Sequence, residues 1–157
     1  MTDKPYSLLQ TSEDLIGDPM FLVDERLAVG GIKLWDWPLS RLFLKNNRDY
    51  PWFIMVPRRA NLTELTQLCQ ADRLQLMEEI HALSVIMTDV FRPDKLNMGA
   101  LGNMVPQFHY HIVGRFKTDP LWPEGIWQRA MTDHPYIVPD ELQQTLLSRI
   151  KQVAFVR

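Results

Sequence analysis

Two histidines, His109 and His111, stand two positions apart inside the segment Gln107–Val113. The segment alternates polar and apolar side chains, which predicts a β-strand. Alternate side chains of a strand share a face, so Gln107, His109 and His111 are expected to project together, about 7 Å from one to the next. Two adjacent imidazoles can divide the work of phosphoryl transfer. One neutral ring supplies a lone pair, while the other donates a hydrogen bond or carries a proton near the ordinary pKa of roughly 6.5.

The same pair has two other interpretations. Either histidine can be a half-buried, hydrogen-bonded strand residue without a chemical role. Alternatively, His-x-His on a strand chelates zinc when a third histidine or a carboxylate arrives from elsewhere. The chain has two further histidines, His81 in the middle of a predicted helix and His134 in a loop-like segment. Neither has a partner that spacing identifies, so we expect no metal and no other cofactor, and zinc is kept as an alternative.

Strands are predicted on both sides of the chain's central region. Arg41–Lys45 and Trp52–Pro57 are short apolar runs that flank the turn-like segment 46–51, which predicts a hairpin. Later in the chain, Asn97–Asn103 is small and turn-prone, and the strand Gln107–Val113 follows it. The sequence therefore predicts a hairpin and a second strand, loop, strand arrangement.

Two helices complete the predicted fold. Asp72–Phe91 carries apolar residues at spacings of three and four, with Asp72 expected to cap the first turn, Gln75 to reach back, and Pro93 to prevent continuation. A final helix is predicted over Pro139–Gln152, with its proline at the first helical position. Strands followed by a helix and then more strands indicate an antiparallel α+β domain, not a parallel doubly wound one. We expect a sheet of about five strands with a long helix packed on it.

Composition excludes several classes of protein. The chain has 157 residues, 17 Lys plus Arg and 19 Asp plus Glu, giving a net charge of -2, so a nucleic-acid partner is not expected. Its apolar runs are far shorter than the roughly 20 residues that span a bilayer, which argues against a membrane protein. The single cysteine, Cys69, cannot form an internal disulfide and favours a reducing compartment. We expect one cytoplasmic domain over 1–157 that binds a small molecule.

The segment Gln107–Val113 resembles the motif of the histidine triad superfamily, His-φ-His-φ-His-φ-φ with φ apolar, with glutamine in place of the first histidine. The loop residues Asn103 and Val105 and the pair Trp122-Pro123 fall where members of that superfamily place comparable residues. The order of predicted elements also matches. The resemblance covers a core of about 22–127, which leaves about 136–157 as a C-terminal helical extension.

The resemblance implies an enzyme or binder of nucleoside phosphates, because the superfamily includes dinucleoside polyphosphate hydrolases, nucleoside phosphoramidases and nucleotidyl transferases. By position, His109 would attack the α-phosphorus, and His111 would contact the α-phosphate and its developing charge. Asn46 matches a position that contacts the ribose, although a tight turn explains it equally well. Asn103 matches a loop residue that contacts phosphate. The resemblance also implies a homodimer, which would cover tryptophans of unassigned burial (Trp35, Trp37 and Trp127).

Two residues depart from the family pattern. Gln107 cannot titrate, so only an orienting role is left to its amide. Trp52 occupies a place where many relatives carry a further histidine, and its indole either stacks on a base or fills the core, with the core favoured. Among the cations, Arg58 and Arg59 are expected in a solvated loop, whereas Arg115 is better placed for an anionic ligand.

Three functions follow from these residues. The first is a hydrolase or nucleotidyl transferase that acts at the α-phosphate of a dinucleoside polyphosphate, such as diadenosine tetraphosphate, or of a nucleoside phosphoramidate. The second is a nucleotide-binding regulatory module with little turnover, and the third is a zinc-dependent hydrolase. Activity without added metal favours the first, binding without product the second, and stoichiometric zinc the third.

Overall fold

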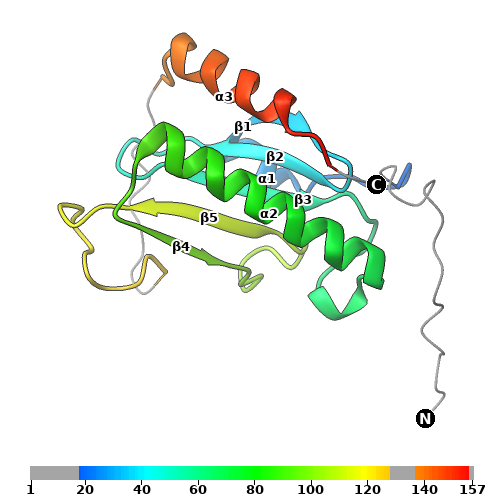
Figure 1. The fold of residues 1–157 in the computed structure, drawn as a ribbon. Helices are drawn as coiled ribbons and strands as arrows, with labels where there is room; N and C mark the ends of the chain where they lie inside the picture. Colours follow the sequence, from blue (N-terminus) through cyan, green and yellow to red (C-terminus); the bar gives the residue numbers. More distant parts are fainter. Residues whose placement is uncertain (1–17, 128–136, 156–157) are drawn as a thin grey trace.

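The computed structural model describes residues 18–127 and 137–155, so His134 lies outside the described part (Figure 1). The chain forms a five-stranded sheet, one long helix and shorter helical elements. In chain order these are α1 (Glu25–Val29), β1 (Gly31–Asp36), β2 (Ser40–Lys45), β3 (Trp52–Pro57), the 3-10 turn η2 (Leu65–Gln67), α2 (Gln70–Phe91), β4 (Lys95–Gly99), β5 (Tyr110–Arg115) and α3 (Asp140–Gln152).

The sheet has the order β1-β2-β3-β5-β4, and every neighbouring pair is antiparallel. This confirms the α+β class and the predicted number of strands. The hairpin is β2 with β3, within one residue of the prediction. Asn97, which was predicted to begin a turn, instead pairs with Val113 inside β4. Its neighbours Lys95 and Leu96 belong to the same strand, which gave no periodic signal in the sequence.

Strand alternation divides the core between the two faces of the sheet. Phe53 and Met55 of β3 belong to the cluster that α2 and α3 cover, which also holds Ile112 of β5. Trp52 and Ile54 belong to a second cluster on the other face. The segments around residues 21–27 and 121–127 cover that second face. Figure 1 shows α2 lying across one face of the sheet with α1 behind it. Both faces of β3 are therefore buried, and all six of its residues are.

The helix α2 begins differently from the prediction. Cys69 is its N-cap, and the Cys69 sulfur accepts a hydrogen bond from the Asp72 main-chain N–H. Asp72 lies inside the first turn and pairs with Arg59, whose guanidinium donates to both carboxylate oxygens at 2.6 and 2.7 Å. Arg58 donates to the carbonyl oxygens of Trp37 and Pro38. The expectation of a solvated arginine pair is therefore wrong, because both guanidinium groups tie loops to the core.

The C-terminal helix packs onto the sheet beside α2. It runs over Asp140–Gln152, and Pro139 is its N-cap residue instead of its first helical residue. Its last turn accepts a hydrogen bond at the Ile150 carbonyl from the Trp37 indole N–H, at 3.1 Å. Trp37 is thus buried within its own chain and gives no reason for a dimer. None of the helices in the described ranges is long and apolar enough to cross a membrane.

Candidate functional site

The two motif histidines meet on the sheet face that α2 does not cover. β5 begins at Tyr110, so His111 lies in the strand while His109 and Gln107 precede it. The imidazole centroids of His109 and His111 are 4.7 Å apart and the rings are nearly perpendicular, at 88°. The rings are closer than the spacing along a strand predicted, because His109 lies outside the regular strand. The expectation that the pair shares one face is confirmed.

His109 is oriented by the main chain of the residue two positions before it. Its Nδ1 lies 2.7 Å from the Gln107 carbonyl oxygen. A carbonyl oxygen only accepts, so Nδ1 must carry a proton. In the neutral ring the lone pair is then at Nε2, the nitrogen that is available to attack an electrophile. The sequence identified His109 but could not show which of its nitrogens is free.

His111 is held in the opposite tautomer. The Trp52 indole N–H points at His111 Nδ1 over 2.9 Å, with the two rings edge to face at 79°. An indole N–H only donates, so His111 Nδ1 must accept and the ring proton lies on Nε2. The pair therefore presents one nitrogen lone pair, from His109, and one N–H donor, from His111.

The surroundings of His111 favour its neutral form. Burial lowers the pKa of His111 to about 3, with smaller contributions from the charges of His109 and Lys45. The centres of the Trp127 and His111 rings are 6.2 Å apart, and Trp127 packs against the hydrophobic cluster to which Trp52 belongs. The Lys45 ammonium lies 4.5 Å from the Trp52 ring centre. A proton added to His111 would meet low polarity and a nearby positive charge.

The side chain of Gln107 serves the fold around the site. Its Oε1 accepts from the Asp24 main-chain N–H at 2.8 Å, and its Nε2 donates to the Leu22 carbonyl at 2.7 Å. The prediction that the Gln107 side-chain amide orients a histidine is therefore corrected. The group that orients His109 is the Gln107 main-chain carbonyl. The fixed segment brings Asp24 near His109. Hydrogen bonds from Arg26 lower the pKa of Asp24 to about 2, and His109 adds a smaller attraction.

Arg115 was predicted to contact an anionic ligand, and the structure places it elsewhere. Its side chain is 2% exposed. The guanidinium donates to both Asp119 carboxylate oxygens at 2.7 and 2.9 Å, and also to Asn97 Oδ1 and the Glu124 carbonyl. Four of its five N–H groups are thus used inside the protein. Arg115 joins β4, β5 and the segment after β5, and we withdraw it as a ligand contact.

The two predicted asparagines lie in loops at the strand ends. Asn46 follows β2 and is half-buried, and its main-chain N–H donates to the Gly30 carbonyl. The turn itself depends on the next residue, since Asn47 Oδ1 accepts from the main-chain N–H groups of Asp49 and Tyr50. Asn103 lies exposed in the loop before β5. The alternative explanation of Asn46 as the turn residue therefore applies to Asn47.

Within residues 18–127 and 137–155, no group of three His, Cys, Asp or Glu side chains is arranged to hold a metal ion. His81 is exposed on α2, on the far side of the sheet from His109 and His111. The motif histidines also use their Nδ1 atoms within the protein. For the zinc alternative, the described residues supply two clustered imidazoles.

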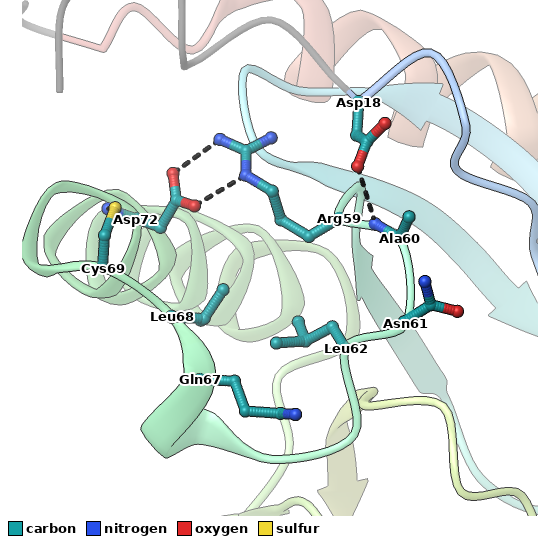
Figure 2. A pocket seen from close by; sticks show the side chains of 9 residues that line it. All are labelled: Asp18, Arg59, Ala60, Asn61, Leu62, Gln67, Leu68, Cys69 and Asp72. Carbon is teal, nitrogen blue, oxygen red and sulfur yellow. Dashed lines mark hydrogen bonds and ion pairs between the residues drawn. The ribbon is translucent and has the colours of Figure 1, made fainter. Parts of the chain in front are cut away.

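A cavity of about 280 Å³ opens beside the start of α2, away from the histidines. Figure 2 shows that its most prominent charged groups, Arg59 and Asp72, face each other in an ion pair, while Asp18 accepts from the Ala60 main-chain N–H. The cavity also includes Cys69, whose sulfur is engaged in capping α2. The histidine pair, where one ring presents a lone pair and the other an N–H donor, is therefore the candidate site.

Comparison with known proteins agrees with this geometry. A family model described as HIT domain matches residues 31–118, which is more than half of the chain. The chain belongs to the histidine triad (HIT) family. A histidine triad protein from Bradyrhizobium japonicum is 34% identical, with a TM-score of 0.76, and the match covers 85% of this chain and 98% of that one. No curated protein matches the sequence.

Two further solved structures show how far the HIT fold extends. A histidine triad protein from Marinobacter aquaeolei is 37% identical with a TM-score of 0.74, over 84% of this chain and 94% of that one. A hypothetical histidine triad nucleotide-binding protein from Sulfolobus tokodaii is 12% identical with a TM-score of 0.56, over 80% and 87% of the two chains, which shows the fold alone. Membership of the HIT family indicates nucleotide binding, or hydrolase or transferase activity, for this protein.

Sequence reasoning missed several residues of this HIT site. Lys45, Trp127 and the segment around Asp24 all lie near the histidines, yet they come from β2, from the region after β5 and from the start of α1. A lysine at a strand end is usually solvated, so its type alone carried no signal. Trp52 did give a signal in the sequence, because it stands where many relatives carry a histidine. Only the structure shows that its indole donates to an imidazole.

Proposed function

We propose that this HIT protein cleaves or transfers at the α-phosphate of a dinucleoside polyphosphate or a nucleoside phosphoramidate through a nucleotidyl-histidine intermediate. The observation that supports this most is the opposite tautomers of the two histidines. His109 presents a lone pair at Nε2 because its Nδ1–H donates a hydrogen bond to the Gln107 carbonyl oxygen. His111 presents a proton at Nε2 because Trp52 donates to its Nδ1. A nucleophile and a donor stand side by side.

In the first step, His109 Nε2 forms a bond to the α-phosphorus, and the bond from phosphorus to the leaving group breaks with its electron pair. A polyphosphate leaves as an anion, whereas an amine takes up a proton from solvent water as it leaves. In the resulting nucleotidyl-imidazolium the proton stays on Nδ1 and is donated in a hydrogen bond to the Gln107 carbonyl oxygen. This charge-assisted hydrogen bond offsets the new positive charge. His111 Nε2–H donates to a non-bridging oxygen, where negative charge develops. In the second step, water attacks the phosphorus, the P–N bond breaks, and the nucleotide leaves with the water oxygen while one proton is released.

Two loop residues are proposed to contact the nucleotide. Asn46 is half-buried at the end of β2, next to Lys45, whose ammonium lies against Trp52. We assign Asn46 to the ribose. Asn103 is exposed in the loop that leads to His109, and we assign it to a phosphate. Trp52 is 4% exposed and bonded to His111, so it is not assigned to base stacking.

A trapping experiment tests the covalent step. Rapid quench with labelled diadenosine tetraphosphate should reveal an acid-labile nucleotidyl adduct on the natural protein and none on His109→Ala, which should still bind nucleotide. His81→Ala is the matched control, because His81 is exposed on α2 and should leave the adduct unchanged. His111→Ala should lower turnover by about a hundredfold, the loss typical of one charge-stabilising donor.

The outcomes also separate the alternatives. Diadenosine polyphosphates and adenosine phosphoramidates would be screened with and without a chelator. Nucleotide bound without any product would favour the regulatory module. Activity that is lost on chelation and restored by zinc would favour the zinc-dependent hydrolase. Near-normal turnover by His109→Ala would refute the nucleotidyl-histidine mechanism.

We propose that the homodimer forms through a surface that does not include Trp35, Trp37 or Trp127. β4 is an edge strand of the sheet, and its Met98 is 44% exposed. Ser84 of α2 contacts the Met98 sulfur, and the outer side of α2 exposes Leu74, Met77 and Val85. A second copy would cover this apolar surface and pair the open edge.

We also propose a cytoplasmic location, because Cys69 is unpaired.

A further inference from the structure

Trp52 connects the two strands that carry the site. It is the first residue of β3, it pairs with Val113 of β5, and the residue as a whole is 4% exposed. Its indole lies edge to face against His111, with ring centres 5.4 Å apart and the N–H directed at Nδ1 over 2.9 Å. This bond belongs to the interior of the protein.

We propose that Trp52 is a positioning residue that locks His111 as a permanently neutral donor, with its proton on Nε2. The proposal rests on the proposed function in one respect, which is that the acceptor for this proton is an α-phosphate oxygen. Trp52 itself touches no substrate. It acts only through the tautomer and the orientation of His111.

The argument is one of hydrogen-bond complementarity. If His111 carried its proton on Nδ1, or carried two protons, that N–H would face the indole N–H and both donors would be left unsatisfied in a buried place. A buried donor without a partner is unfavourable, because it has lost its hydrogen bonds to water and gained none in the protein. The Nε2–H tautomer has no such penalty. The ring is also unable to rotate by half a turn and keep the bond, since a carbon would then face the indole N–H.

The neighbouring groups reinforce the same state. His109 faces His111 from the loop before β5, and Lys45 faces it from β2. The residues that pair with His111 across the sheet, Ile54 of β3 and Gly99 of β4, carry no charge. No described carboxylate is among the groups that perturb this ring. An added proton on His111 would therefore be opposed by one lysine and, when protonated, by His109.

A neutral donor and a charged donor make different enzymes. An ordinary histidine loses its second proton near pH 6.5, so a site that needed an imidazolium at this position would fail at neutral pH. His111 instead offers the same N–H throughout the neutral and mildly acidic range. It also cannot pass a proton through the ring, because the indole at Nδ1 has no lone pair to receive one. Trp52 thus makes His111 a fixed charge stabiliser and excludes it as a general acid or base.

The first experiment reads the tautomer directly in the full chain without nucleotide. Nitrogen NMR of imidazole-labelled protein should show His111 with the proton on Nε2 and should show no titration of the ring between neutral pH and pH about 5. The same spectrum should show His109 with its proton on Nδ1. An Nδ1-protonated or titrating His111 in the natural protein would overturn the proposal, whatever its activity.

The second experiment removes the indole donor. Trp52→Phe keeps an aromatic ring and deletes the N–H, and Trp37→Phe is the matched control. Trp37 is equally buried and donates from its own indole to the Ile150 carbonyl, on the other side of the sheet from the site. Trp52→Phe should mix the two tautomers of His111, lower kcat by about five- to tenfold with little change in KM, and add a new histidine ionisation to the pH profile.

These outcomes separate the two claims. Trp37→Phe should lose thermal stability but keep the pH profile and kcat. An unchanged tautomer and pH profile in Trp52→Phe would refute the positioning role. If every nucleotide screened is left intact while the tautomer behaves as described, the proposed reaction fails and the structural role of Trp52 stands. Should Trp52→Phe fail to fold, the spectrum of the natural protein still decides the question.

Discussion

The low pKa of His111 has a consequence for stability that can be measured without a substrate. The perturbation is a fall in pH from about 7.5 to about 4.5. In the unfolded chain an imidazole takes up a proton below roughly pH 6.5. In the native state burial keeps His111 neutral until pH about 3. Between these values the unfolded state binds more protons than the native state, so the free energy of unfolding falls as the pH falls.

The magnitude follows from the two pKa values. Each pH unit between them contributes about 1.4 kcal/mol, and roughly two such units lie between pH 6.5 and pH 4.5. The expected loss from His111 alone is about 2–3 kcal/mol at pH about 4.5, and the contribution vanishes above pH about 7, where both states are neutral. A typical domain has a total stability of about 5–15 kcal/mol, so the effect is large enough to measure.

Urea unfolding followed by circular dichroism, at fixed protein concentration and several pH values, gives the required free energies. Other groups titrate over the same range, so the test is a difference between two proteins. His111→Asn is the reference variant, because an asparagine oxygen can still accept from the Trp52 indole and cannot be protonated in this range. The natural protein should lose about 2–3 kcal/mol more than this variant. Equal pH dependence in the two proteins would show that His111 is not held neutral.

The remaining predictions concern the fold and the assembly. Arg115→Ala should lower the free energy of unfolding by about 3–5 kcal/mol, because it leaves the buried Asp119 carboxylate unpaired, and Arg115→Lys should recover little of the loss since a lysine cannot form the two-pronged contact. Denaturant unfolding measures both, and a loss below about 1 kcal/mol would mean that the pair is unimportant. Sedimentation at micromolar concentration should show a dimer that Met98→Asp, on the open edge of β4, converts to monomer, whereas a purely monomeric natural protein would refute the assembly.

Elements with a strong local pattern could be predicted from the sequence. The hairpin of β2 and β3 and the long helix α2 agree with their predicted ranges within about two residues, because apolar runs that flank a turn and apolar residues spaced by three and four are local properties of the chain. A strand was predicted before the loop that leads to β5, but the bounds of β4 were not, because it is an edge strand of five residues with side chains that are exposed or half-buried and lacks the apolar alternation of a core strand. The start of α2 was predicted two residues late because Asp72 is a good N-cap by residue type. In the structure its carboxylate pairs with Arg59, and Cys69 is the N-cap.

The site shows the same division. Strand alternation alone predicted that His109 and His111 share a face, and the structure confirms it. Residue type suggested a ligand contact for Arg115, but a carboxylate four residues along the chain, Asp119, pairs with it in the interior. An arginine looks the same in a sequence whether its partner is a ligand or a buried aspartate.

What the sequence determined by itself is the spacing of the two motif histidines, their common face and the class of fold around them, since these depend on residue order within single elements. What only the tertiary structure decided is the tautomer of His111 and the anchoring of the Gln107 segment, whose carbonyl accepts from His109. Trp52 is 59 residues from His111 along the chain, and Gln107 contacts Leu22 across 85 residues. A tautomer is fixed by whichever donor or acceptor lies within about 3 Å, and such neighbours are brought together by strand pairing and packing, which no local pattern records.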